Sequence, residues 1–171
     1  MDDNKLTKFL TSAKLNGYSS GNAYYKGKIA GTMEFSFKDG KLKYADIYSG
    51  TVSFIGQETV FENNIPQWGM VYYGAILDDS YDSKEVYDFL RSALRTMPES
   101  LPLRGNDVFS NNKFTYKNAS EGDIGHFMGY EEIEEADNVI YEMHYSGGYI
   151  IWIEIMWTAL KYLTLNLQND S

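Results

Sequence analysis

Apolar residues follow helical spacing in two segments of the chain. In the first, the positions i, i+3, i+4 and i+7 are occupied by Leu6, Phe9, Leu10 and Ala13, so one face of an α-helix is apolar there. Asp3 or Asn4 is the expected N-cap. In the second, the apolar positions are Val86, Phe89, Leu90, Ala93, Leu94 and Met97. Asp82 or Ser83 is expected to cap this helix and Pro98 to end it.

The remaining apolar residues alternate with polar ones, which is typical of strands that bury one face. We expect strands at about 32–38, 41–48, 53–61 and 67–76 before the second helix, and at about 113–117, 125–134 and 138–146 after it. Asp39-Gly40 is a strong hairpin signal between the first two strands. Residues 16–31 are rich in Gly, Ser and Tyr and are predicted to form a loop.

The chain repeats part of itself at an offset of 73 residues. Aligning residues 54–74 with 127–147 gives seven identities in 21 positions, and they include Phe54, Gly56, Glu58, Met70 and Tyr72. Upstream, the match continues at an offset of 72 with Lys41, Tyr44 and Gly50 against Lys113, Tyr116 and Gly122. The sequence therefore predicts a tandem duplication, whose halves would pack with pseudo-twofold symmetry and leave a groove between them.

The order of elements is helix, antiparallel sheet, helix, antiparallel sheet, which predicts the α+β class. We expect a single compact domain with a first half at 1–77, a second half at 78–150 and an extension at 151–171. Residues 149–165 are nearly all apolar, broken by Glu154 and Lys161 among others. This run is too short and too charged for a membrane span. A C-terminal apolar helix is expected there, either buried against the sheet or forming a homodimer contact.

Composition excludes several kinds of function. The net charge of -9 disfavours direct nucleic-acid binding, which relies on Lys and Arg. The chain has no cysteine and only two histidines, so we expect no metal site, and no cofactor motif is present. The first residues contain no signal peptide, so a cytoplasmic protein without membrane attachment is expected.

Aromatic residues and paired glutamates are the candidate binding groups. The chain has 15 tyrosines, and this side chain combines an apolar face with a polar tip. Glu58 and Glu131 each follow a glycine by two residues, at equivalent places in the repeat. The absent side chains of Gly56 and Gly129 would leave open space beside them. The predicted ligand-binding set is Glu58, Trp68, Tyr72, Glu131 and Tyr145, with no catalytic residue. For the two glutamates the alternative is a structural role, with hydrogen bonds from a Tyr hydroxyl or a backbone turn.

Three stretches of the sequence resemble an uncharacterised bacterial domain family. They are residues 44–50 (Tyr-Ala-Asp-Ile-Tyr-Ser-Gly), residues 54–60 (Phe-Ile-Gly-Gln-Glu-Thr-Val) and residues 66–74 (Pro-Gln-Trp-Gly-Met-Val-Tyr-Tyr-Gly). Members of that family occur alone or fused behind a helix-turn-helix of the phage-repressor type, so the resemblance implies a sensor-like accessory domain. A more distant architectural analogy links the tandem layout to effector-binding domains of the gyrase-inhibitory-protein type.

These observations lead to a functional hypothesis with alternatives. The chain is expected to be a non-catalytic module that binds a small organic molecule, cationic or aromatic, in an aromatic and glutamate-lined groove between the repeats. One alternative is a protein-interaction or inhibitor module with an acidic face. Another is a protein that sequesters a nucleotide signal, provided that Arg91, Arg95 and Arg104 converge. The last is a hydrolase that uses Glu58 and Glu131.

Overall fold

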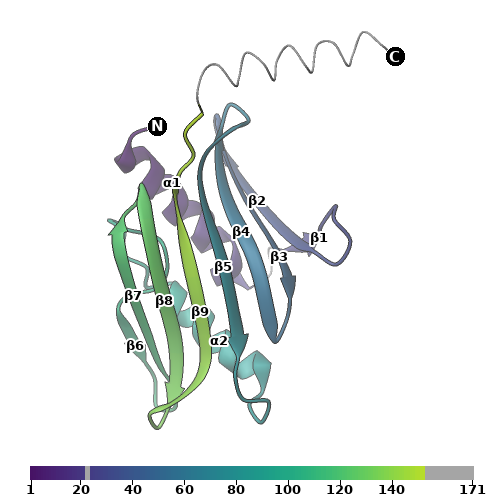
Figure 1. The fold of residues 1–171 in the computed structure, drawn as a ribbon, viewed down its shortest axis with the longest axis vertical. Helices are drawn as coiled ribbons and strands as arrows, with labels where there is room; N and C mark the ends of the chain where they lie inside the picture. The colour runs from purple at the N-terminus through teal and green to yellow at the C-terminus, as the bar shows by residue number, and fades with distance from the viewer. Residues whose placement is uncertain (22–23, 153–171) are drawn as a thin grey trace.

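The protein is built around one antiparallel sheet of nine strands. The computed structural model describes residues 1–21 and 24–152. The strand order is β1-β2-β3-β4-β5-β9-β8-β7-β6 (Figure 1). The first five strands are β1 (Tyr25–Lys26), β2 (Met33–Asp39), β3 (Leu42–Gly50), β4 (Ser53–Glu62) and β5 (Ile65–Ile76). The other four are β6 (Val108–Ser110), β7 (Thr115–Asp123), β8 (His126–Glu135) and β9 (Asn138–Tyr149).

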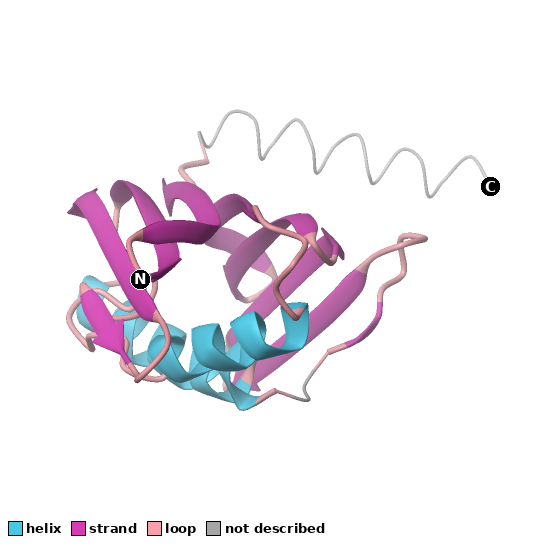
Figure 2. Cartoon of the chain, turned by 90° about the horizontal axis from the view of Figure 1, so that it is seen from below, coloured by secondary structure: helices cyan, strands magenta, loops and turns pink. Residues whose placement is uncertain are grey.

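Two α-helices, α1 (Asp3–Asn16) and α2 (Ser83–Leu94), and the short 3-10 helix η1 (Tyr18–Ser20) complete the described part of the chain. The sheet curves around α1 and α2, which lie on its concave face (Figure 2). Leu6, Leu10 and Ala13 of α1 are fully buried there, so the helical spacing of the sequence is used to cover the sheet. Neither helix is long and apolar enough to cross a membrane, and this finding concerns residues 1–21 and 24–152.

The expected α+β class is wrong, because the protein is mainly β. The two sheets that we expected are one, since β5 pairs with β9 along the whole seam from Trp68↔Tyr149 to Ile76↔Tyr141. Alternation along a strand indicates which face is buried, but it does not indicate which strand lies alongside. The predicted C-terminal apolar helix falls on residues 153–171, outside the described residues.

The element boundaries differ from expectation in a few places. Asp2, and not Asp3 or Asn4, caps α1 by accepting a hydrogen bond from the Lys5 amide at 2.9 Å. Asp82 caps α2 as expected, but the helix ends at Leu94. Beyond it, the amides of Thr96 and Met97 bond to carbonyls three residues back, which tightens the chain before Pro98. The short elements η1, β1 and β6 were not expected.

Positions that match in sequence lie at corresponding places in the sheet. Both β4 and β8 carry a bulge, at Val60/Phe61 and at Ile133/Glu134. Gly50 and Gly122 both have positive φ, at 98° and 94°. Across the central seam, Tyr72 of β5 lies directly opposite Tyr145 of β9. The duplication itself stays a prediction, but these correspondences allow each half to be compared with the other.

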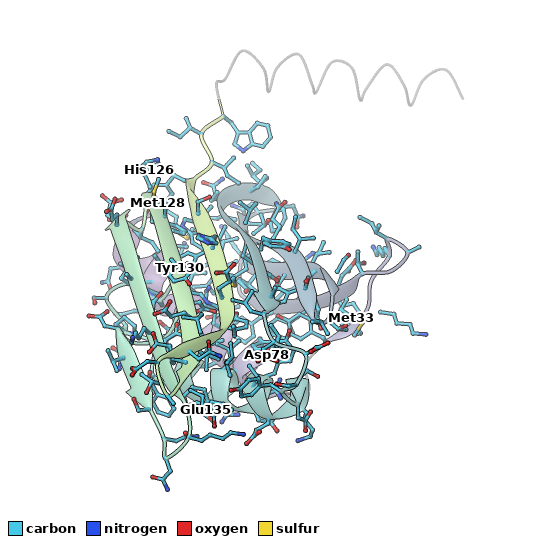
Figure 3. The ribbon with its side chains drawn as sticks, turned by 60° about the horizontal axis from the view of Figure 1, so that its bottom comes forward. Met33, Asp78, His126, Met128, Tyr130 and Glu135 are labelled. Carbon is cyan, nitrogen blue, oxygen red and sulfur yellow. The ribbon has the colours of Figure 1, made fainter. Side chains whose placement is uncertain are left out.

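The convex face of the sheet carries exposed apolar side chains. Along β8, His126, Met128 and Tyr130 follow one another in alternate positions (Figure 3), and Met128 is more than half exposed. Ile55 and Val71 on β4 and β5 are exposed on this face as well. The buried side chains lie on the opposite, concave face.

Tyrosine rings occupy the space above the two glycines that precede the glutamates. A Cβ on Gly56 would lie 2.3 Å from the Tyr72 ring, and a Cβ on Gly129 would lie 2.2 Å from the Tyr145 ring. Each tyrosine therefore crosses over the glycine on the neighbouring strand. The expected open space beside the glutamates is absent at both glycines, because a ring occupies it.

We predict that Gly129→Ala destabilises the fold by about 1–3 kcal/mol, because the added methyl must displace the packed Tyr145 ring. Urea unfolding measures the change. In a Tyr145→Leu background the obstructing ring is gone, so the same substitution should cost much less. An equal cost in both backgrounds would contradict the packing explanation.

Candidate functional site

A cavity of about 400 Å³ lies between the concave face and the helices. Strands β3, β4 and β5 form one wall, with two residues of β9, and the other wall comes from α1, η1 and α2. Its volume is within the range of small-molecule sites. Much of the lining is aromatic and comes from Tyr18, Tyr24, Tyr44, Tyr48, Tyr72, Tyr87 and Tyr141.

Glu58 reaches this cavity from β4 and is only 3% exposed. Lys14, in the last turn of α1, places its Nζ 2.6 Å from Glu58 Oε2. Lys14 Nζ also donates to the carbonyl of Leu103 at 2.9 Å. The Lys14 ammonium group is therefore the close partner of this covered carboxylate oxygen, which accepts no hydrogen bond from another described residue.

Asp46 lies on β3 directly opposite Glu58 and is 5% exposed. Two tyrosine hydroxyls donate to it, Tyr72 to Oδ1 at 2.7 Å and Tyr24 to Oδ2. Burial and then the nearby charge of Glu58 raise the pKa of Asp46 to about 6, against the lowering effect of the two hydroxyls and Lys14. The carboxylate therefore titrates close to neutral pH.

Lys14 is buried beside the same carboxylates and is 7% exposed. Burial lowers the pKa of its ammonium group, while the charge of Glu58 acts in the opposite direction. The first half of the sheet therefore holds two carboxylates and one ammonium group in contact with the cavity.

Glu131, the counterpart of Glu58, is fully buried, and both of its oxygens accept hydrogen bonds. Arg104 donates two of them, from Nε to Oε2 at 2.8 Å and from Nη2 to Oε1 at 2.6 Å. The hydroxyls of Tyr116 and Tyr141 donate at 2.7 and 2.9 Å. With four donors, this carboxylate has the features of a structural group.

The other two predicted residues lie outside the cavity lining. Trp68 is fully buried, its indole N–H donates to the carbonyl of Ile124 at 2.8 Å, and its ring stacks on Phe127. Tyr145 donates to Asn118 Oδ1 at 2.7 Å. Of the five predicted residues, the structure thus brings Glu58 and Tyr72 to the cavity, and their binding of a ligand stays a prediction.

Three lining residues were missed, and the sequence contained a signal for two of them. Asp46 alternates with Tyr44 and Tyr48 on one strand face, so a charge is placed among inward-facing rings. Lys14 stands four residues after Leu10, on the apolar stripe of its helix. A charge on a buried face requires a partner. Tyr24 comes from the expected loop, and no local pattern marks it.

The described residues show no metal centre. Among residues 1–21 and 24–152, no group of three or more His, Cys, Asp or Glu side chains is arranged to hold a metal ion.

We predict that Arg104→Met destabilises the protein by about 3–5 kcal/mol, because it leaves Glu131 buried without its cation. Chemical denaturation is the measurement. Lys117→Met is the matched control, since Lys117 is 47% exposed and pairs with Glu134 on the surface, where a pair contributes about 1 kcal/mol or less. Similar losses in the two variants would contradict this assignment.

We predict that Asp46→Asn gains stability relative to the unsubstituted protein as the pH rises from 4 to 7. The folded pKa of Asp46, about 6, lies above its ordinary value of 3.8, so the folded state binds this proton more tightly than the unfolded state. Ionising Asp46 therefore costs folding free energy between these values, up to about 3 kcal/mol at about 1.4 kcal/mol per pKa unit.

Denaturation curves at several pH values test this difference. The control is Asp78→Asn, because hydrogen bonds from Ser80 lower the pKa of Asp78. That carboxylate stabilises the fold when ionised, and its contribution develops mainly below about pH 4, so the relative stability of its variant should fall slightly or stay constant, and not rise, between pH 4 and 7. The same pH trend in both variants would contradict the role given to Asp46.

Comparison with known proteins adds a family and no function. Searches of curated proteins and of solved structures gave no significant match. Residues 46–150, more than half of the chain, match the model of a family described as a domain of unknown function (DUF5680). This agrees with the resemblance to an uncharacterised domain family, while the fusion to regulators stays an expectation. The match includes β4, β5, β8 and β9, with Asp46 as its first residue, and the chain belongs to the DUF5680 family.

Proposed function

We propose that the chain is a non-catalytic module that binds a small organic molecule in the cavity between the helices and the first half of the sheet. The observation that carries this proposal is a tyrosine-lined cavity of about 400 Å³ whose wall holds the two buried carboxylates of Glu58 and Asp46 with Lys14 as the one ammonium group paired with them among the described residues. A ligand with a hydrogen-bond donor or a positive charge would stabilise these buried carboxylates further.

The lining supports recognition over catalysis. Tyrosine rings supply flat apolar surface, and their hydroxyls are fixed by hydrogen bonds such as that of Tyr72 to Asp46. A rigid aromatic wall with a few polar groups is the usual composition of a ligand site. A hydrolase that uses both glutamates is not favoured, because four donors occupy Glu131.

Nucleotide sequestration is not favoured either, because the three arginines named for it have separate partners. Arg104 binds Glu131, Arg91 pairs with Asp88, and Arg95 donates to the carbonyl of Ser19. Arginines that are already engaged provide little free charge for a phosphate group.

The proposal is tested by thermal unfolding of the full chain against a library of metabolites and drug-like compounds. A ligand that binds the folded state at one hundred times its dissociation constant raises stability by about 2.7 kcal/mol. We predict that at least one chemical class raises the melting temperature, and that Leu94→Trp abolishes this shift because the indole fills the cavity from α2.

Leu77→Trp is the matched control, because Leu77 is 50% exposed and lies after β5. It makes the same change of size outside the cavity and should keep the shift. No shift with any compound, or a shift that survives Leu94→Trp undiminished, would refute the cavity as the binding site.

A further inference from the structure

The two halves of the sheet balance their buried charges differently. In the second half, Asn118 lies opposite Glu131, and Arg104 supplies one positive charge for one carboxylate. Asn118 itself is neutral and bonds to Tyr145 and to the carbonyl of Gly105. The charges of this half are therefore balanced within the protein.

The first half carries one negative charge more. Asp46 stands where the second half has Asn118, and it lies opposite Glu58. Lys14 is the one cation in contact with this pair of carboxylates among the described residues. Tyr24 and Tyr72 donate hydrogen bonds to Asp46 but carry no charge. Like charges on facing residues repel, so this position favours a second cation.

The other cations at the cavity wall do not fill that role. Arg104 donates from Nε and Nη2 to Glu131, which balances its charge. Lys84 pairs with Asp88 at the rim, and its side chain is 79% exposed, so solvent screens its charge. Arg91 is only 20% exposed, but it also pairs with Asp88 and lies over the Tyr18 ring at 5.4 Å, so Asp88 already balances its charge. The surplus of negative charge deep in the cavity therefore remains.

The surplus negative charge and the tyrosine rings occur together. Tyr24 and Tyr48 meet edge to face at 5.3 Å on the wall beside Asp46, and tyrosine faces attract cations. Resting on the proposed function, we propose that the ligand is a protonated organic amine, whose positive charge lies beside these rings and compensates the second carboxylate of the Asp46–Glu58 pair. Such a ligand would give the first half the charge balance that the second half already has.

Isothermal titration calorimetry of the full chain with three phenyl compounds of similar size tests the ligand class. The probes are 2-phenylethylamine, which is cationic at pH 7.5, neutral 2-phenylethanol and anionic 3-phenylpropionate. We expect the amine to bind at least about tenfold more tightly than the alcohol, because the alcohol can donate a hydrogen bond to a carboxylate but lacks the charge that would balance it. The anion is expected to bind most weakly.

Substitutions test which carboxylate is responsible for the preference for the amine. Asp46→Asn copies the residue found at position 118 and should reduce the preference for the amine over the alcohol at least about tenfold. Glu58→Gln should do the same if the first variant does not fold. Glu121→Gln is the control, because Glu121 lies on the convex face, in an open groove that Ile55, Val71 and Met128 also line, so the lost negative charge is outside the cavity and the preference should stay unchanged.

The outcomes separate the two proposals. Equal binding of alcohol and amine, preference for the anion, or an amine preference that neither Asp46→Asn nor Glu58→Gln lowers would overturn the amine assignment and leave the cavity as a binding site. If none of the three probes binds but a library compound does, the charge of that compound decides. A neutral or anionic compound would overturn the amine assignment, and a protonated amine would support it. If nothing binds, both proposals fail.

Discussion

Burying carboxylates beneath a sheet is the constraint on which the rest of this structure depends. Glu58 and Glu131 point from the middle of the sheet into its concave side, where water cannot solvate them, and each needs a cation and donors. The chain supplies Lys14 from the end of α1 and Arg104 from the segment after α2. These ion pairs tie the helical layer to the sheet at two points, in addition to the apolar packing of Leu6 and Leu10.

The buried glutamate is surrounded by side chains in the second half of the sheet, whereas in the first half it lies beside a cavity. Around Glu131, the planar guanidinium and two phenols fill the space and use every oxygen. Around Glu58, a single ammonium group offers a point charge without the fork of an arginine. Trp68, which stands where the second half has Tyr141, turns its N–H toward Ile124. Fewer donors around the carboxylate and a cavity beside it therefore occur together.

Local sequence patterns predicted most of the strands and both helices, but they could not predict how the strands assemble. The long strands alternate clearly, whereas β1 and β6 contain two and three residues, too few for a pattern. The β5–β9 seam depends on residues about 70 positions apart, so the fold class was missed. At the site, the repeat identified Glu58 and Tyr72. It also selected Glu131 and Tyr145, because equivalent positions share a register even where their surroundings differ, whereas Trp68 was selected as an aromatic residue of the same strand face.

The register of the central seam has a consequence for the origin of the sheet. Tyr72 and Tyr145, which match in the sequence alignment, face each other across an antiparallel ladder, so under the predicted duplication each half pairs with the other as it would pair with a copy of itself. A chain that ended after β5 would expose this twelve-residue strand as an open edge, and such edges recruit further strands. Two such chains could join with Tyr72 opposite Tyr72 and rebuild the seam. Fusing them into one polypeptide would then have let Asp46 and Asn118 diverge, which identical subunits cannot do.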